Sequence, residues 1–324
     1  MQTHELVVSC EVGRHEEGRA LLELLVKRFP YHDQARWAEL IAEGRLLLND
    51  DPCHAEQVLR CGDQLTYTIP DHQEPEVSQQ IELVHATADF LLVGKPAGVP
   101  LHRTGQIVVK TFVNQLRHRF GEEVHPLHRL DQETSGLLLC ARNGEVNRHY
   151  QSRRDELLDG KFYLALVKGS FPDGETLCEQ PLATLPESLV RCRMWPVTDG
   201  KSCQTHFRKV AEADGLSLVL AELLTGRRHQ IRAHLASLGT PLLGDKIYAH
   251  DGRYFLKRLD SPLTEDDFQQ LGARTHCLHA WAVHLNLPAQ PRQTYFSTLF
   301  SDDFRQALSR FPAWETRAKN LLLR

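Results

Sequence analysis

The stretch with the clearest chemical potential is residues 128–139, HRLDQETSGLLL, where charged residues come directly before an apolar run. An ionised carboxylate at the edge of a hydrophobic core is costly unless a partner stabilises its charge. Asp131 therefore has two interpretations. It caps a turn or a helix, which is the commoner role of a single aspartate, or it is a catalytic carboxylate.

A second cluster lies in residues 159–169, DGKFYLALVKG, where Lys161 and Tyr163 begin a predicted strand. The alternation of Tyr163, Ala165 and Val167 is typical of a strand with one buried face. Taken alone, Tyr163 is explained by packing in a sheet, which is the commoner role of a strand aromatic.

A third cluster is LLTGRRHQIRAHLASLG, in which an apolar strand is predicted to end before Gly226. A helix is expected to follow, with Arg228 and Arg232 four residues apart on one face. The opposite face would turn the apolar residues Ile231, Leu235 and Leu238 toward the core. Periodicity alone explains the two arginines as a solvated helix face and does not join the three clusters into one site.

The elements that carry these clusters divide into two predicted domains joined by a linker. Residues 1–70 contain two amphipathic helices followed by two strands, RLLLNDDP and DQLTYTI. The apolar helix faces consist of Leu21, Leu24, Leu25, Trp37, Leu40 and Ile41. Residues 71–80 are rich in charge and proline and are expected to be the linker. Residues 81–324 mix strands and helices without a regular βαβ alternation, which favours an α+β domain.

Composition excludes some classes of protein. The net charge of −4 argues against nucleic-acid binding through bulk positive charge, although a local basic patch would suffice. We expect no membrane association and a cytoplasmic location, because no run of 18 uncharged apolar residues and no signal-peptide pattern are present. The eight cysteines form no C-x-x-C pair, so reduced thiols are expected.

Five ordered motifs resemble those of the RluA-type pseudouridine synthases. HRLDQETSGLLL is similar to the signature H-R-L-D-x-x-T-S-G-L-L, and GKPAGVPLH resembles the K-P-x-G segment. KFYLALVKG resembles K-x-Y-x-A, and LHAWAVHL fits the closing L-H-A element. LLTGRRHQIRAHLASLGTPLLGDKIY resembles L-x-T-G-R-x-H-Q-I-R-x-H-L with its trailing G-D-x-x-Y. The resemblance spans about residues 82–287, and five motifs in family order are a specific signal.

The resemblance implies a mixed, largely antiparallel central sheet flanked by helices, preceded by a small N-terminal α/β module. It implies that uridine within RNA is isomerised to pseudouridine: the N1–C1′ bond is broken and C5 is joined to C1′. A base in structured RNA has to be flipped out first. No cofactor is expected because there is no redox change. No metal is expected either, since the histidine clusters near 125–128 and 276–279 lack a second metal-spaced pair.

The resemblance also implies roles for individual residues. Asp131 is expected to be the catalytic carboxylate that meets positive charge at the ribose, and Arg232 its ion-pair partner. Tyr163 is expected to stack on the flipped base and to help remove the C5 proton. The remaining substrate-binding residues are expected to be Arg129, which would enter the RNA stack, together with His128, Thr134, Lys161, Arg228 and His229.

Residues 14–69 resemble, more loosely, an S4-like RNA-binding module. Its expected phosphate-binding face consists of Lys27, Arg28, Arg36 and Arg45. A module that only packs or binds protein is the alternative.

Two rival functions stay open at this point. One is a non-catalytic RNA-binding or assembly factor on the same fold, and the other is a nucleosidase that uses Asp131 to release free uracil. The expected substrate is 23S ribosomal RNA, with transfer RNA as the alternative target, and a monomer is expected.

Overall fold

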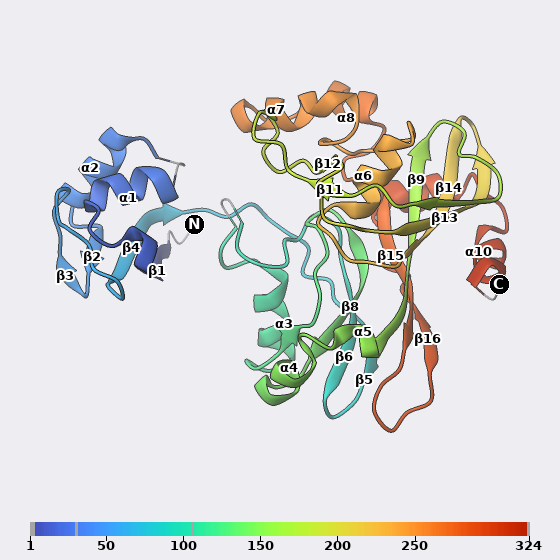
Figure 1. Cartoon of the computed structure of the whole chain (residues 1–324), viewed down its shortest axis with the longest axis horizontal. Coiled ribbons are helices and arrows are strands. Elements are labelled where there is room, and N and C mark those ends of the chain that lie inside the picture. The colour runs from blue at the N-terminus through green and yellow to red at the C-terminus, as the bar shows by residue number, and fades with distance from the viewer. Residues whose placement is uncertain (1–3, 30–31, 105–106, 323–324) are drawn as a thin grey trace. The chain divides into compact units, whose positions relative to one another are not determined.

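The computed structural model describes residues 4–29, 32–104 and 107–322. The chain consists of two compact units, Met1–Pro75 and Glu76–Arg324 (Figure 1). The division lies inside the charged, proline-containing segment expected to be the linker. Each unit has its own hydrophobic core.

The N-terminal unit packs two helices on a four-stranded sheet of order β1-β4-β2-β3. The helices are α1 (Leu21–Arg28) and α2 (Gln34–Ala42), and a 3-10 turn covers Arg14–Glu16. The strands are β1 (His4–Glu11), β2 (Leu46–Leu48), β3 (Asp51–Pro52) and β4 (Gln64–His72). The apolar helix faces are buried as expected. Strand β1 was not predicted, because its side chains alternate between exposed and half-buried positions and so show little apolar pattern.

The basic residues expected on a phosphate-binding face of this unit are mostly paired with carboxylates. Arg28 contacts Glu16 at 2.9 Å, and Arg45 contacts Glu5 at 2.7 Å. Arg36 lies between two glutamates at 3.0 and 3.3 Å. The unit carries 14 Asp and Glu against seven Lys and Arg, a net charge of −7 that leaves +3 for residues 76–324. Positive charge is therefore concentrated in the larger unit.

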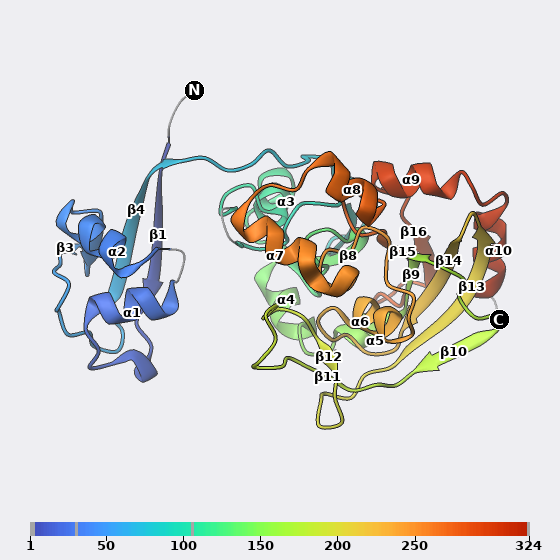
Figure 2. The same cartoon turned by 90° about the horizontal axis from the view of Figure 1, so that it is seen from above.

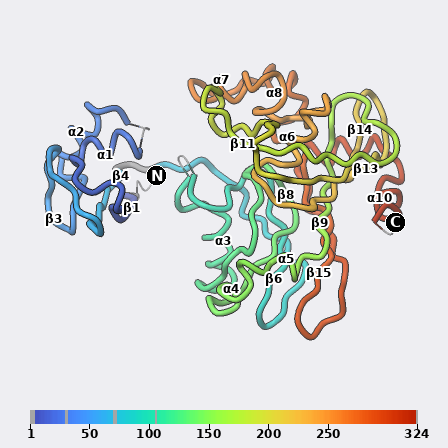
Figure 3. Tube along the Cα trace, in the orientation of Figure 1, coloured from blue at the N-terminus to red at the C-terminus, as the bar shows by residue number. Residues whose placement is uncertain are grey.

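The larger unit is built on one mixed, largely antiparallel sheet. Its main path runs β10-β13-β14-β9-β15-β8-β6-β5, and only the β15–β8 pair is parallel among the described strands. The strands of this unit are β5 (Glu82–Ala86), β6 (Phe90–Lys95), β7 (His125–Pro126), β8 (Ser135–Ala141), β9 (Leu158–Lys168), β10 (Glu175–Cys178), β11 (Leu182–Ala183), β12 (Trp195–Pro196), β13 (Thr205–Ala213), β14 (Leu216–Leu223), β15 (Leu278–Leu285) and β16 (Gln293–Phe296). The trace in Figure 3 shows β9 and β15 side by side in the middle of the unit.

Helices flank this sheet, which confirms the predicted α+β fold class. Figures 1 and 2 place α3 and α4 beside β6 and β8, and α10 beside β13. The helices are α3 (Phe112–Phe120), α4 (Gly144–Tyr150), α5 (Arg154–Leu157), α6 (Gln230–Ser237), α7 (Arg253–Asp260), α8 (Glu265–Leu271), α9 (Asp302–Leu308) and α10 (Trp314–Leu322). A 3-10 turn, His250–Gly252, precedes α7.

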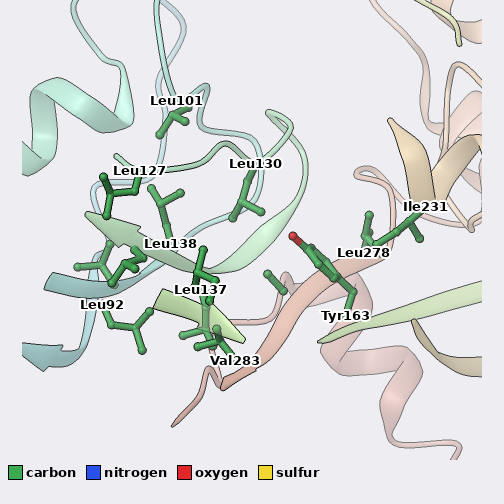
Figure 4. Packing of buried hydrophobic residues seen from close by; sticks show 14 of the residues in the cluster. Leu92, Leu101, Leu127, Leu130, Leu137, Leu138, Tyr163, Ile231, Leu278 and Val283 are labelled. Atoms are coloured by element: carbon green, nitrogen blue, oxygen red, sulfur yellow. The ribbon is translucent and has the colours of Figure 1, made fainter. Parts of the chain in front are cut away.

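Strand β9 is buried on both faces. Tyr163, Ala165 and Val167 point into one core cluster, whereas Phe162 and Leu164 point into the other. The sequence alternation was therefore correct in period, but the second face is also covered. Figure 4 shows Tyr163 between Leu137 and Leu278, with its hydroxyl directed toward Leu130.

Gly136 explains the T-S-G part of the motif that follows Asp131. It has φ of +103° and lies where β8 meets β15. A Cβ at this position would collide with the carbonyl group of Ala280. Glycine allows the two strands to approach at the point where the loop that carries Asp131 enters the sheet.

Two details of the third sequence cluster were predicted wrongly. Helix α6 begins at Gln230, so Arg228 precedes the helix and does not share a helical face with Arg232. His229 takes the left-handed conformation (φ 55°, ψ 16°), which breaks the helical path before Gln230. Leu238 was expected in the core but is 37% exposed, because it lies just after the end of α6.

All eight cysteines are free thiols. Among the described residues, no helix combines the length and apolarity that crossing a bilayer would require.

Candidate active site

Two adjoining clefts open on the face of the larger unit where the sequence motifs meet. The first, of about 930 Å³, is bounded by β9, by the loop before β8 and by the start of α6. The second, of about 1530 Å³, extends toward residues 100–104 and α7. Both are lined by Arg129, Leu130, Asp131, Arg228, His229 and Arg232. The first cleft carries six Lys and Arg side chains against two Asp, so the local basic surface expected from the sequence is present.

Asp131 and Arg232, 101 residues apart, form an ion pair at the junction of the two clefts. Arg232 donates from Nη1 to Asp131 Oδ2 at 2.8 Å. Burial by itself would raise the pKa of Asp131, but the Arg232 guanidinium outweighs it and brings the pKa to about 2. The Asp131 side chain is 18% exposed. An ionised carboxylate is thus held rigidly and still reaches the cleft.

Asp245 holds the other side of Arg232. It accepts from Arg232 Nε at 2.8 Å and from Nη2 at 2.9 Å, in a bidentate contact. Its Oδ1 also accepts the backbone N–H groups of Ile247 and Tyr248. Although burial raises the pKa of the Asp245 carboxyl, Arg232 lowers it to well below its usual range. The guanidinium is therefore fixed by a fully buried carboxylate and turns one nitrogen toward Asp131.

Gly244 lets Asp245 reach this position. It has φ of +79°, and a Cβ there would collide with the Thr275 carbonyl oxygen. The G-D-x-x-Y pattern therefore combines a glycine turn, a buried acceptor and Tyr248, whose ring lies 5.2 Å from the Arg232 guanidinium. The motif was visible in the sequence, but neither Asp245 nor Tyr248 was assigned a role from it.

His229 faces Asp131 from the start of α6. Its Nε2 lies 3.8 Å from Asp131 Oδ2, and its Nδ1 lies 3.3 Å from the Tyr248 hydroxyl. Burial, and then the Arg232 charge, lower the pKa of His229 to about 3. The imidazole beside Asp131 is neutral near pH 7 and adds no positive charge to the ion pair.

Tyr163 lines the first cleft. Its side chain is 7% exposed, and no protein hydrogen bond to its hydroxyl is formed within the described part of the chain. Burial and the negative charge of Asp131 raise the pKa of Tyr163 above its usual range. The phenol therefore stays protonated at neutral pH and can donate a hydrogen bond into the cleft.

Lys95 is hydrogen-bonded to the loop that carries Asp131. It is fully buried and donates at 2.9 Å to the carbonyl oxygens of Pro96, Val99 and Gln132. Burial lowers the pKa of Lys95 to about 7. The lysine of the K-P-x-G segment thus binds backbone carbonyl groups. One of these belongs to Gln132, the residue that follows Asp131.

Glu133, for which the sequence suggested no role, ties the same loop to the segment after α6. Both of its carboxylate oxygens accept from Lys246 Nζ at 3.0 Å, and Oε2 also accepts the His276 N–H at 3.0 Å. The side chains of Lys246 and Glu133 are 7% and 17% exposed. No periodicity marks such a contact, because the partners are 113 residues apart.

Replacing Glu133 by Gln is expected to destabilise the protein by roughly 2–4 kcal/mol, because Lys246 would lose its buried counter-charge. The unfolding midpoint should fall by about 5–15 °C, measured by differential scanning calorimetry. The control is Glu315→Gln, which removes an exposed i,i+4 pair with Lys319 and should change the midpoint little. Equal midpoints for the Glu133 variant and the unchanged protein would refute this role of the contact.

The other predicted substrate-binding residues differ in whether they are exposed in the clefts or hydrogen-bonded within the protein. Arg129 is exposed and lines both clefts, whereas Arg228, also exposed, donates to the Cys192 carbonyl. Lys161 lines the first cleft and contacts Asp155 at 2.9 Å. His128 accepts the Leu139 N–H, and Thr134 Oγ1 lies 2.8 Å from His276 Nε2. The polar atoms of these last two residues are thus engaged within the protein.

Comparison with known proteins identifies the class. The sequence model of the RNA pseudouridylate synthase family matches residues 89–237. An RNA pseudouridine synthase of Synechocystis sp. is 31% identical over 233 residues, which are 72% of this chain and 80% of the relative. The chain therefore belongs to the RNA pseudouridine synthase family, of the RluA type, which confirms the resemblance inferred from its motifs.

Further relatives and a solved structure extend this comparison. A mitochondrial tRNA pseudouridine(32) synthase from Saccharomyces cerevisiae is 32% identical and covers 72% of this chain and 51% of the relative. Ribosomal large subunit pseudouridine synthase D from Pseudomonas aeruginosa is 27% identical, covering 93% and 94%. The structure of human RNA Pseudouridylate Synthase Domain Containing 1 has a TM-score of 0.52 at 25% identity, covering 74% and 99%. The chain spans about half or less of the length of several curated relatives, for example 42% of a mouse pseudouridylate synthase.

Proposed function

We propose that this protein is an RNA pseudouridine synthase in which Asp131 is the catalytic carboxylate. The observation that carries the proposal is the ion pair of Asp131 with Arg232, at 2.8 Å, opening into a cleft lined by six Lys and Arg side chains. Breaking the glycosidic bond of a uridine builds positive charge at the ribose, and a fixed, ionised carboxylate stabilises it or attacks the substrate. The basic lining supplies the contacts to RNA phosphates.

Arg232 and Tyr163 complete the proposed active site. Arg232 keeps Asp131 ionised and directs one oxygen to the cleft, while Asp245 fixes Arg232. The ring of Tyr163 stacks on the flipped uracil, and its protonated hydroxyl donates a hydrogen bond during rearrangement of the base. Arg129, exposed beside Asp131, enters the RNA stack at the place that the uridine leaves.

The proposed substrate is a uridine in large-subunit ribosomal RNA. The Pseudomonas relative named for that substrate aligns with nearly the whole chain, whereas the yeast tRNA enzyme aligns with 72% of it. Transfer RNA is the second candidate, favoured by the higher identity to the yeast protein, 32% against 27%. We assign RNA binding to the larger unit, since the N-terminal unit has a net charge of −7 and three of its four expected phosphate-binding residues are paired with carboxylates.

The test is incubation of the protein with 23S ribosomal RNA and with transfer RNA transcripts, followed by mapping of pseudouridine. The expected result is conversion at specific sites in ribosomal RNA without release of uracil. Release of free uracil would support a nucleosidase instead. Tight RNA binding without any product would support an assembly factor.

Replacing Tyr163 by Phe is expected to lower the single-turnover rate by about 10²–10⁴-fold, because the hydroxyl donor is absent. RNA affinity should stay within about twofold, since the stacking ring remains. Replacing Tyr163 by Leu removes both and should also weaken binding. Rapid-quench kinetics and fluorescence anisotropy separate the two effects. A Phe variant as fast as the unchanged protein would leave Tyr163 with a stacking role alone.

A further inference from the structure

A separate groove lies between α3, β7 and α4, next to the second cleft. Its volume, open to solvent, is about 910 Å³, and its lining residues include four basic side chains and no carboxylate. The basic residues, named here the α3–α4 groove cluster, are His102, Arg103, Arg117 and His125. Asn147 of α4 lines the same groove. The guanidinium groups of Arg103 and Arg117 therefore have no carboxylate among the lining residues to offset their positive charge.

Arg117 and Asn147 each leave a polar atom without a partner. Arg117 Nε and Asn147 Oδ1 are inaccessible to solvent and form no hydrogen bond in the described part of the chain. Leaving such an atom unsatisfied costs about 1–3 kcal/mol. Arg119, two residues further along α3, donates to the Ile81 carbonyl instead. Arg117 thus lines the groove with no hydrogen bond from its side chain within the described residues, whereas the Arg119 side chain is paired.

The groove is continuous with the cleft that reaches Asp131. His102 and Arg103 line both the groove and the second cleft. Burial lowers the pKa of His102, and the positive charges of Arg129 and Arg117 lower it further. Both guanidinium groups are therefore close enough to act on His102. Positive charge thus extends from Arg129, beside the catalytic carboxylate, to Arg117 on α3.

The helix dipole accounts for only part of this pattern. Arg117, His118 and Arg119 occupy the last turn of α3, where cations are favourable. That preference is satisfied by exposed side chains and does not require Arg117 to turn into a groove with Arg103, His102 and His125.

We propose that the α3–α4 groove binds the phosphate backbone of the RNA strand that leads away from the flipped nucleotide. The inference rests on the proposed function and adds a second contact region outside the active site. Arg103 and Arg117 each contact a phosphate, which positions the strand without reading its sequence. The imidazoles of His102 and His125 add hydrogen bonds to phosphate or ribose oxygens.

The test compares Arg103→Gln, Arg117→Gln and the double variant with Arg119→Gln, which removes the same charge from the same helix outside the groove. The probe is a fluorescein-labelled transcript of the 23S ribosomal RNA segment in which the wild-type protein forms pseudouridine, or a labelled 20-nucleotide oligouridylate if it forms none. Anisotropy titrations at several salt concentrations give Kd and its salt dependence. The slope of log K against log[salt] is negative. Removing one phosphate-binding arginine should make it less negative by about 0.7–0.9.

The expected result for the double variant is a Kd raised by about 10–100-fold. Its salt slope should be less negative by about 1.5. With a modified transcript, KM should rise and kcat should be preserved at saturating RNA. Unfolding midpoints should not fall, because the side chain of neither arginine has a partner within the described residues. A double variant with the same Kd and salt slope as Arg119→Gln would refute the proposal that the groove binds RNA phosphates. A variant that binds weakly only because its midpoint has fallen overturns it as well.

Failure of the groove and failure of the proposed function give different results. If the wild-type protein binds RNA but forms no pseudouridine, the proposed function is wrong. The salt slopes measured with oligouridylate then still show whether Arg103 and Arg117 bind RNA phosphates. If pseudouridine forms normally and the slopes of all variants agree, only the groove proposal is wrong.

Discussion

A protein carrying Asp131→Asn is expected to form no measurable pseudouridine while binding RNA with nearly unchanged affinity. The amide fills the same space and can still accept from Arg232, but it carries no charge to meet the positive charge at the ribose and is a poor nucleophile. Loss of one such electrostatic or covalent group lowers the rate by about 10³-fold or more. Binding should persist because the basic residues of the cleft are intact.

Single-turnover kinetics with mapped transcripts measure the rate, and anisotropy measures the affinity. The matched control is Asp302→Asn, which makes the same chemical change on a side chain that is 99% exposed, at the start of α9. This control should react at the wild-type rate. Product formation by the Asp131 variant within about tenfold of wild type would falsify the assignment of the catalytic carboxylate.

Asp245→Asn is expected to have the largest effect on stability. An amide cannot accept both Arg232 Nε and Nη2, so a guanidinium in a 5% exposed side chain would keep only Asp131 as its counter-charge. Breaking a buried ion pair from one side costs about 3–5 kcal/mol. For a unit of this size the unfolding midpoint should fall by roughly 6–20 °C. Catalysis should fall too, because Arg232 would no longer be held against Asp131.

Differential scanning calorimetry measures the midpoint, and single-turnover kinetics well below it measure the rate. Glu265→Gln breaks an exposed pair with Arg274 and should leave both unchanged. Because Asp245 does not face the cleft, a lower rate in a variant that stays fully folded identifies it as a positioning residue. An Asp245 variant with unaltered midpoint and rate would show that Arg232 is held by other contacts.

The individual motifs could be interpreted from the sequence because each is a local pattern. The alternation in residues 163–167 placed Tyr163 on a strand, and the apolar periodicity placed Ile231 and Leu235 on a buried helix face. Local pattern failed at helix boundaries. Arg228 was placed on α6 because spacing cannot reveal the left-handed His229, after which the helix begins. It failed also for Leu238, whose exposure depends on where the helix ends.

The amino-acid sequence by itself determined the α+β class, because short-range periodicity predicts strands and helices without βαβ alternation. It also determined the resemblance to the pseudouridine synthase family, because five motifs occur in the family's order along the chain. Only the tertiary structure decided what surrounds Asp131. Lys246 contacts Glu133 across 113 residues, Lys95 contacts Gln132 across 37, and Arg232 contacts Asp245 across 13. Such contacts have no period to detect, because a buried charge is stabilised by whichever group the fold brings within about 3 Å.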